Sequence, residues 1–265
     1  MKRLILTYTQ SCNLTCDFCY VTFSNKRTED KSIQIIERAI SLKFDIITFG
    51  GGDSFSKKYF RDSCILAKKN GIITHVDTNC LAIKPTDLNF IIDNIDILGV
   101  SLDGTEDIHN SMRKSKNLFL KVDKILKNLQ RLNYKVKINT VVTNQNKNNL
   151  ECLFLYLNKF TNLSYWSLYQ FFPLDAAIKN KNIFEVSDSD FDIVTQNFQS
   201  KKFRIEKFKY TDRISGYIFC DEIGNVYTNS IDCNYSKIGS IFDSNIDQKL
   251  KSMNLDINPK VIHRY

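Results

Sequence analysis

Three cysteines lie within eight residues near the start of the chain. Cys12, Cys16 and Cys19 form a CxxxCxxC pattern in QSCNLTCDFCYVTF. Thiolates at these spacings suit iron–sulfur clusters or zinc, but a structural zinc site and a ferredoxin-type cluster each take four ligands. The next cysteine, Cys64, falls in a predicted helix, and none of the three histidines is nearby. Three thiolates on a four-iron cube would leave one iron open to a further ligand.

The cysteine pattern, with Phe18 at its aromatic position, resembles the CxxxCxΦC signature of the radical S-adenosylmethionine (SAM) superfamily. The resemblance implies that Cys12, Cys16 and Cys19 hold a [4Fe–4S] cluster whose open iron chelates SAM, and that Phe18 packs beside the adenine. It also implies the reaction, in which SAM is split reductively to a 5′-deoxyadenosyl radical that removes a hydrogen atom from the substrate. The alternative is an incidental cysteine loop or an unusual zinc site.

A glycine run, ITFGGGD, follows the second predicted strand. Glycine lets the backbone approach a ligand closely. The run resembles the family's GGE motif, which implies that Gly51, Gly52 and Asp53 hold the amino group of SAM. Asp53 replaces the usual Glu, so the negative charge is kept but the side chain that carries the carboxylate is shorter.

Two further strand ends carry polar residues that resemble family segments. Thr78 in HVDTNC matches a Thr-Asn-Gly segment that contacts SAM or substrate, with Cys80 in place of the glycine, a change that can alter the loop's shape. SLDG, residues 101–104, resembles the SPASM-containing branch and the molybdenum-cofactor cyclase. That resemblance implies that Ser101 contacts SAM, that Asp103 bonds the ribose and that Arg113 pairs with the methionine carboxylate.

The fifth and sixth predicted strands supply the remaining candidates. Strand alternation in VKINTVV places Lys137, Asn139 and Val141 on one face, and a buried lysine needs an anionic partner. The segment is similar to one in the molybdenum-cofactor cyclase whose lysine meets substrate phosphate, so Lys137 and Asn139 are predicted to bind substrate. A lysine that reaches solvent is the alternative. Phe172, in YWSLYQFFPL, is placed near adenine by the same resemblance. His109 is interpreted as a structural hydrogen-bonding residue, and no catalytic acid or base can be named.

Short apolar runs alternate with helical patterns over two-thirds of the chain. We expect strands at Leu4–Tyr8, Asp45–Phe49, Ile72–Asp77, Ile95–Leu102, Lys135–Val142 and Tyr165–Phe172. We expect helices near 31–43, 56–70, 86–93, 117–132 and 148–159. Such alternation predicts an α/β fold with a parallel sheet and right-handed crossovers, here a partial (β/α)6 TIM-like barrel over residues 1–180. The motifs follow predicted strands, where barrel active sites lie.

Residues 181–265 have a different pattern and predict a small C-terminal α+β extension that caps the substrate. A helix near 187–199, a Gly224–Asn225 turn and a helix near 244–252 are expected, with the short strands forming a small antiparallel appendage. The extension resembles a SPASM or twitch extension and, loosely, the C-terminal part of viperin and its prokaryotic kin, which are nucleotide dehydratases. Residues 201–210 mix basic and aromatic residues, as nucleic-acid faces sometimes do, but strand alternation places Phe203 and Ile205 together and favours a half-exposed edge strand.

The other cysteines are interpreted as structural. Cys64 and Cys152 lie on predicted helices and are expected to pack there. Cys220 and Cys233 lie in the extension. Because an auxiliary cluster uses more cysteines than these two, none is predicted there.

The bulk composition indicates an ordinary globular protein with an excess of positive charge. Its 265 residues carry a formal net charge of +8, which favours an anionic partner. No apolar run is long enough to cross a bilayer and no secretory signal is evident, so a cytoplasmic protein with no membrane partner is predicted.

The family resemblance predicts an oxygen-sensitive enzyme supplied with electrons by a donor such as flavodoxin or ferredoxin. Its substrate is expected to be an anionic, nucleotide-like small molecule. Maturation of a ribosomally made peptide is the alternative, and a non-catalytic iron–sulfur or zinc protein is a remote one. Nucleic acid is not an expected partner.

Overall fold

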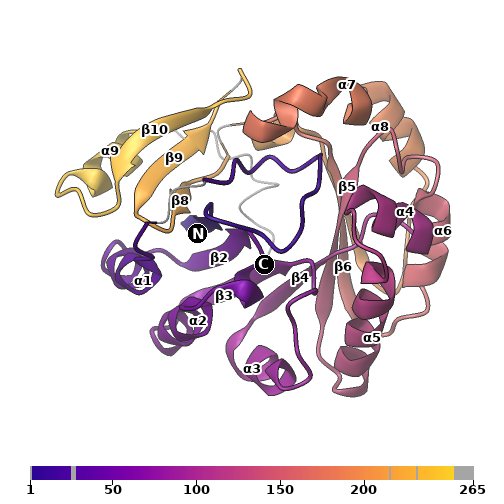
Figure 1. The fold of residues 1–265 in the computed structure, drawn as a ribbon, viewed down its shortest axis with the longest axis horizontal. Helices are drawn as coiled ribbons and strands as arrows, with labels where there is room; N and C mark the ends of the chain where they lie inside the picture. The colour runs from indigo at the N-terminus through magenta and orange to yellow at the C-terminus, as the bar shows by residue number, and fades with distance from the viewer. Residues whose placement is uncertain (1, 25–27, 215, 231, 254–265) are drawn as a thin grey trace.

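The computed structural model describes residues 2–24, 28–214, 216–230 and 232–253. Within these residues ten strands form one sheet in the order β10-β9-β8-β1-β2-β3-β4-β5-β6-β7. Six neighbouring parallel strands make up its centre. They are β1 (Arg3–Tyr8), β2 (Ile46–Gly51), β3 (Ile73–Thr78), β4 (Ile97–Ser101), β5 (Val136–Val142) and β6 (Leu163–Gln170). The sheet is curved but not closed, which confirms the predicted partial barrel (Figure 1).

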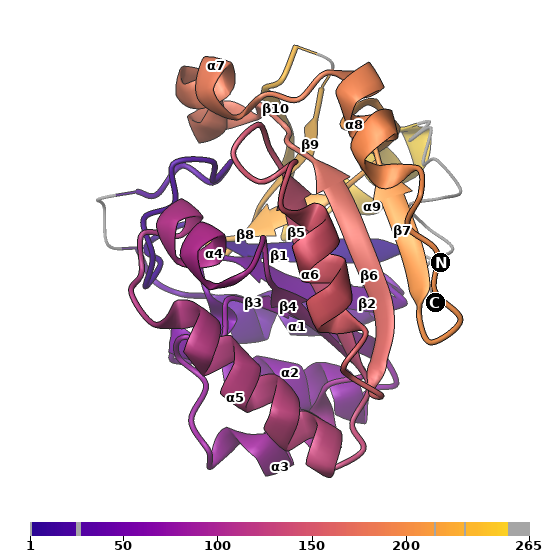
Figure 2. The same cartoon turned by 90° about the vertical axis from the view of Figure 1, so that its right-hand side faces the viewer.

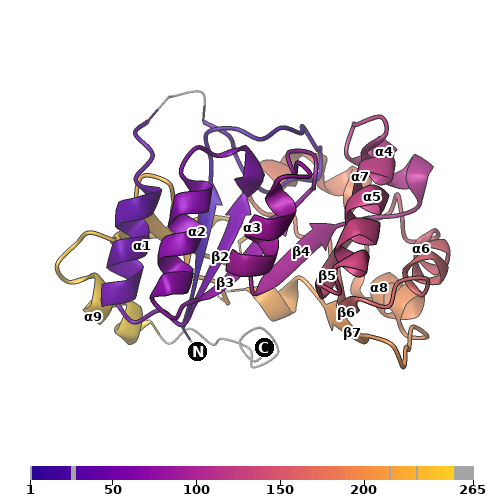
Figure 3. The same cartoon turned by 90° about the horizontal axis from the view of Figure 1, so that it is seen from below.

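Helices between these strands cover the outer face of the curved sheet (Figures 1 and 3). They are α1 (Ser32–Ser41), α2 (Phe60–Lys69), α3 (Asp87–Asn94), α4 (Glu106–Met112), α5 (Leu118–Arg131) and α6 (Leu150–Leu157). All five expected helices are present. The pattern did not predict α4, because in that short, polar segment only His109 and Met112 are buried. α2 begins later than expected, since residues 54–56 form a separate 3₁₀ turn capped by Asp53.

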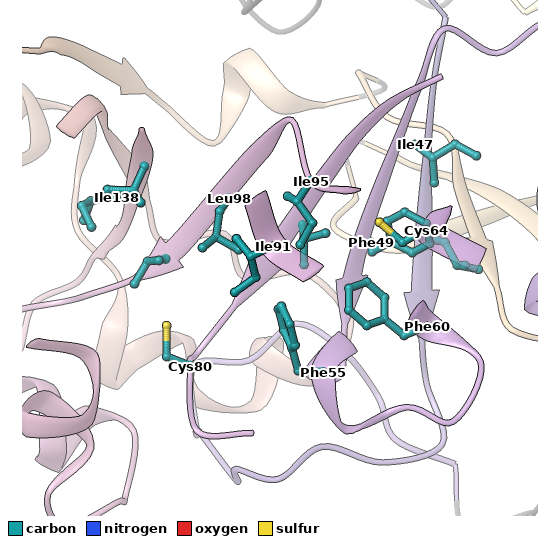
Figure 4. Packing of buried hydrophobic residues seen from close by; sticks show 14 of the residues in the cluster. Ile47, Phe49, Phe55, Phe60, Cys64, Cys80, Ile91, Ile95, Leu98 and Ile138 are labelled. Atoms are coloured by element: carbon teal, nitrogen blue, oxygen red, sulfur yellow. The ribbon is translucent and has the colours of Figure 1, made fainter. Parts of the chain in front are cut away.

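The hydrophobic core lies between these helices and the outward-facing side of the strands. In α5, Leu118, Val122, Ile125 and Leu129 are buried at spacings of three and four, together with Leu126. Phe49, Phe55 and Phe60 pack edge to face, with ring centroids 5.0–5.4 Å apart (Figure 4). Burying such side chains stabilises the fold by about 2 kcal/mol each. The core therefore fixes the outer side of the sheet and leaves the inner side for other residues.

The cysteines on the helices have different environments. Cys64 is fully buried in α2, where its sulfur lies 3.3 Å from the carbonyl oxygen of Asn94, so its predicted packing role is confirmed. The packing predicted for Cys152 is wrong, because its side chain is exposed on α6. None of the helices in the described residues is both long and apolar enough to cross a membrane.

The C-terminal part joins both edges of the same sheet, and two of its strands are parallel to barrel strands, which differs from the small antiparallel appendage expected. After α7 (Lys181–Phe184) and α8 (Asp188–Thr195), β7 (Arg204–Phe208) adds in parallel to β6 and forms the predicted edge strand. β8 (Phe219–Asp221) pairs in parallel with β1 at the opposite side of the barrel. An open barrel leaves unpaired backbone groups at both edges, and these strands satisfy them.

A hairpin completes the sheet beyond β8. β9 (Asn225–Asn229) and β10 (Tyr235–Ser240) are antiparallel, and α9 (Ile246–Ser252) packs beside β10 (Figures 1 and 2). The expected Gly224–Asn225 turn lies between β8 and β9, where Gly224 has a φ of +96°. The C-terminal part therefore reaches the mouth of the barrel from two sides.

Candidate active site

A cavity of about 280 Å³ opens on the inner side of the curved sheet. Residues from β1 to β6, the loops that follow them and the C-terminal part all line it. Among the sequence-predicted site residues, these line the cavity: Cys12, Cys16, Phe18, Cys19, Gly51, Asp53, Thr78, Ser101, Arg113, Asn139 and Phe172. Gly52, Asp103 and Lys137 do not line it. Folding thus brings together residues spread over 161 positions of the sequence, Cys12 to Phe172.

The three cysteines lie in residues 9–24, which we call the cysteine loop. Each thiol is partly buried, and the amide of Cys19 donates to the carbonyl oxygen of Cys16 at 3.2 Å. Burial raises the pKa of Cys16 to about 12 and also raises that of Cys19, so metal binding must displace their protons. Within the described residues no three His, Cys, Asp or Glu side chains are placed to hold a single metal ion. All three cysteines line one cavity, and a cubane would take one thiolate on each of three irons, so the chemistry of this donor set fits a cluster.

The cysteine loop is anchored on both sides of the barrel mouth. The carboxylate of Glu222, between β8 and β9, accepts hydrogen bonds from the amide and hydroxyl of Thr9 at 2.8 and 3.0 Å. The carbonyl oxygen of Glu222 accepts from the amide of Lys31, so this residue holds both flanks of the segment that carries the cysteines. On the other side, Asp17 pairs with Lys114 at 2.6 Å, and its carbonyl accepts from Asn180 at 2.8 Å.

The glycine run allows the cysteine loop to approach β2. Gly51 has a φ of +81°, and a Cβ there would lie 2.6 Å from the amide nitrogen of Tyr8. A Cβ on Gly52 would lie 2.1 Å from the carbonyl oxygen of Ser11, and the Gly52 amide donates to Tyr8 at 2.8 Å. Gly51 lines the cavity and Gly52 does not. The SAM contact predicted for Gly52 has no support in this geometry, because Gly52 lies between the backbone of Tyr8 and that of Ser11.

Asp53 ties neighbouring loops together. Its carboxylate accepts hydrogen bonds from the hydroxyl of Thr78 at 2.8 Å and from the amides of Asn79 and Phe55 at 2.9 and 3.1 Å. Burial raises the pKa of this carboxyl. Cys80 adopts a φ of +67°, so the loop keeps the left-handed backbone that a glycine would take at this position.

Arg113 faces the cavity beside Phe18 and is held by a buried carboxylate. Its guanidinium carbon lies 5.4 Å from the Phe18 ring centroid, and its Nε lies 2.6 Å from Asp103. Asp103 is fully buried and also accepts from the amide of Val141 at 3.0 Å. Burial alone raises the pKa of a carboxyl, but Arg113 outweighs it and lowers the pKa of Asp103. Since Asp103 lies behind the cavity wall, the predicted ribose contact has no support in this geometry.

His109 has the structural role expected of it. It is fully buried, and its Nδ1 accepts a hydrogen bond from the amide of Asp103 at 3.1 Å. Burial lowers the pKa of His109, which keeps the ring neutral and able to accept. His109 therefore helps to place the Asp103–Arg113 pair.

Aromatic rings form the side of the cavity next to the cysteines. Phe18 and Phe171 both contact Phe184 of α7, with centroids 5.9 and 5.8 Å apart. Phe172 lies on the cavity wall, 5.9 Å from Tyr210 and 5.2 Å from the guanidinium of Arg213. Flat apolar surfaces of this kind suit a planar base.

The deeper part of the cavity is polar, and the sequence analysis missed most of it. Thr48, His75 and Asp77 on β2 and β3 line it together with Asn139 of β5. We call these four residues the cavity floor. They occupy inward-facing positions paired across neighbouring strands, for example Thr48 with His75. The alternation used for β5 could have found them, had it been applied to β2 and β3.

Lys137 is buried, so the alternative of a lysine reaching solvent is wrong. Only 2% of the residue is exposed, and its Nζ lies 3.1 Å from the Tyr169 hydroxyl. It does not line the cavity, although it lies on the same face of β5 as Asn139, which lines the cavity and donates to Asp77 at 2.6 Å. Arg3 and Arg213 also line the cavity, and neither was predicted. Arg3 begins β1, and Arg213 comes from the C-terminal part.

Comparison with known proteins identifies the family. The Radical SAM superfamily model matches residues 6–155. A S-adenosylmethionine-dependent nucleotide dehydratase of Lacinutrix mariniflava is 28% identical over 274 residues, covering 94% of this chain and 55% of that protein. A cysteine-type anaerobic sulfatase-maturating enzyme of Clostridium novyi is 27% identical over 181 residues, covering 60% of this chain and 48% of that protein. This chain therefore spans about half the length of these two relatives.

Solved structures show the same fold. Streptococcus suis SuiB, bound to the precursor peptide SuiA, superposes with a TM-score of 0.71 at 17% identity. The match covers 92% of this chain and 63% of SuiB. At this identity the likeness concerns the fold alone. The family model covers more than half of the chain, from β1 into α6. The chain thus belongs to the radical SAM superfamily, whose cofactors are a [4Fe–4S] cluster and SAM.

Proposed function

We propose that this chain is a radical SAM enzyme that removes a hydrogen atom from a nucleotide-like anionic small molecule. Cys12, Cys16 and Cys19 are the proposed cluster ligands. The proposed SAM site is the adjoining part of the cavity, formed by Phe18, Gly51, Thr78, Ser101, Arg113 and Phe172. When bound, the cluster and SAM supply the electron and the 5′-deoxyadenosyl radical.

The residues around the cysteines match the chemical groups of SAM. The Arg113 guanidinium is suited to a carboxylate, and its own charge is balanced by Asp103 behind the wall. Phe18 and Phe172 offer apolar faces for an adenine. Asp53 is engaged by three donors and holds the surrounding loops in place. We propose that these residues bind SAM, orient it and exclude water from the site.

The observation that carries the substrate proposal is the pair of guanidinium groups on the cavity wall. Arg3 and Arg213 come from distant parts of the chain and line the same cavity. Guanidinium groups bind phosphate oxygens well. Alignment with the Lacinutrix nucleotide dehydratase over 94% of this chain also supports a nucleotide, because it includes the C-terminal part that supplies Arg213.

The C-terminal part is the proposed cap over the substrate, and we place its start at residue 181. Arg213, Tyr217 and Phe219 from this part line the cavity. The electron donor is proposed to be a flavodoxin or a ferredoxin. Its approach would be to the cysteine loop, where the thiols are only partly buried.

Maturation of a peptide is the second candidate. The Clostridium relative and SuiB with its precursor peptide favour it. However, that relative aligns with only 60% of this chain. A concave pocket lined by several cations fits a small anion better than an extended peptide.

An anaerobic assay of 5′-deoxyadenosine formation tests the proposal. The reconstituted protein is given reductant and SAM with each ribonucleoside triphosphate in turn, and with candidate precursor peptides. We expect a nucleotide to raise the rate, and Arg213→Met to abolish that stimulation. Stimulation by a peptide and by no nucleotide would favour the second candidate. Absence of iron from protein prepared without oxygen would overturn both.

A further inference from the structure

Asp77 presents a carboxylate to the cavity with only one of its oxygens engaged. Oδ1 accepts from the Asn139 amide at 2.6 Å and lies 3.2 Å from Nε2 of His75. The Asp77 side chain is 39% exposed, and it lines the cavity. Among the contacts of the described residues, none engages Oδ2. This oxygen is therefore available to a bound molecule.

The neighbouring strand leaves room for this arrangement. Gly99 on β4 is paired with Asp77 and lies beside it on the inner face. A Cβ on Gly99 would lie 2.1 Å from Oδ1 of Asp77 and 2.6 Å from Nδ2 of Asn139. Any other residue at position 99 would therefore force the pair apart. Asp77, Gly99 and Asn139 form one unit across β3, β4 and β5.

The surroundings keep Asp77 ionised. Burial lowers the pKa of His75 to about 4, so the ring is neutral near pH 7, with Thr48 Oγ1 3.3 Å from its Nδ1. Burial alone raises the pKa of a carboxyl, but His75 and Lys137 outweigh it and lower the pKa of Asp77 to about 2. An ionised carboxylate oxygen can only accept hydrogen bonds. It attracts a donor and repels phosphate.

We propose that Asp77, positioned by Asn139 and His75, recognises the substrate by accepting a hydrogen bond from a neutral donor of the bound nucleotide. The donor is a sugar hydroxyl or a base amino group. This inference rests on the proposed function and adds to it, since it names the kind of substrate group that Asp77 recognises. The phosphates are proposed to be bound by Arg3 and Arg213, and the donor by Asp77.

A double-mutant cycle tests this role. Binding of the ribonucleoside triphosphates and of their 2′-deoxy and 3′-deoxy forms is measured by calorimetry on the reconstituted protein with SAM. We expect loss of the recognised hydroxyl to weaken binding to the wild type about tenfold or more, and to have no further effect in Asp77→Ala. Comparison of CTP with UTP gives the same test for an amino donor.

Matched variants separate recognition from folding. Asp93→Ala, on the exposed side of α3, should keep the wild-type preference for the hydroxyl or amino group. Asp77→Leu is close to the aspartate side chain in shape and has no hydrogen-bond acceptor, so it replaces Asp77→Ala if that variant does not fold. Iron per chain and circular dichroism report folding.

The outcomes of the cycle are distinct. Non-additive losses for one donor group support the inference. Additive losses for every analogue would overturn it while leaving the proposed function intact. If the wild type binds none of the nucleotides, the proposed function itself is refuted, and the inference with it.

Discussion

The cysteine loop and the cavity floor line one cavity but are held in place by different kinds of interaction. The cysteine loop is held largely at its backbone: Gly52 closely approaches the carbonyl oxygen of Ser11, and Glu222 accepts hydrogen bonds from the amides of Thr9 and Lys31. The cavity floor depends on side chains of adjacent strands, such as His75, Asp77 and Asn139. Residues that hold a cofactor through local backbone shape form a contiguous motif. Residues that meet across strands do not.

The largest effect is expected from removing one thiol of the cysteine loop. Cys16→Ala should abolish SAM cleavage, because a cluster with two thiolates is not held. Iron per chain and 5′-deoxyadenosine formation measure this. Cys152→Ala, at the exposed cysteine of α6, should retain both. Full SAM cleavage in Cys16→Ala would refute the assignment of the cluster ligands.

The buried ion pair behind the cavity wall should have the next largest effect. Asp103→Asn leaves the Arg113 charge without its partner, which should reduce the free energy of unfolding by about 3–5 kcal/mol. Glu185→Gln, which removes the exposed pair with Lys181, should change it by about 0.5 kcal/mol or less. Urea unfolding compares the two variants. Equal effects would show that the Asp103 pair is not a structural support of the site.

The cavity floor should make the protein sensitive to acid. The pKa of His75 is lowered by burial to about 4, whereas an unfolded histidine titrates near 6.5, so only the unfolded chain takes up this proton between these values. Stability is therefore lost as the pH falls from about 6.5 to about 4, by about 2–3 kcal/mol from this group.

His75→Gln should remove this part of the pH dependence, measured by urea unfolding at pH 4.5 and pH 7. The pKa of His109 is also lowered. The variant should therefore keep a dependence of stability on pH that comes from His109 and is smaller than that of the wild type. An unchanged slope would mean that His75 is not buried in its neutral form.

Glu222 tests whether the C-terminal part holds the cysteine loop. Glu222→Gln keeps the shape but weakens the hydrogen bonds from Thr9, so the free energy of unfolding should fall by about 1–3 kcal/mol. Iron per chain after reconstitution should fall as well. Glu37→Gln, on the exposed side of α1, is the matched control. If iron loading is the same in both variants, the loop does not depend on this anchor.

The smallest effect concerns the loop after β3. At an ordinary buried position, alanine is more stable than glycine, but Cys80 has a φ of +67°. We therefore expect Cys80→Gly to be more stable than Cys80→Ala by about 1 kcal/mol, although it removes more side chain. Thermal unfolding measures this difference. The opposite order would show that the loop takes another backbone in solution.

Much of the site could be predicted because its residues follow predicted strands. The cysteines, Phe18, Gly51, Ser101 and Arg113 were predicted from the resemblance of their motifs to those of the family, and they do line one cavity. Their roles toward the cluster and SAM stay predictions. Gly52 and Asp103 belong to the same motifs but face away from the cavity, since a motif does not show which of its members supports the others.

The sequence by itself determined the strand–helix order, the partial barrel and the three-thiol signature, because each depends on local spacing. Only the tertiary structure decided the pairing of β8 with β1 and the hydrogen bonds between Glu222 and the cysteine loop. It also decided the contacts of Asp77 with His75 and Asn139. These depend on which strands become neighbours and in which register. Contacts between residues 62 or 213 positions apart produce no periodic pattern in the sequence.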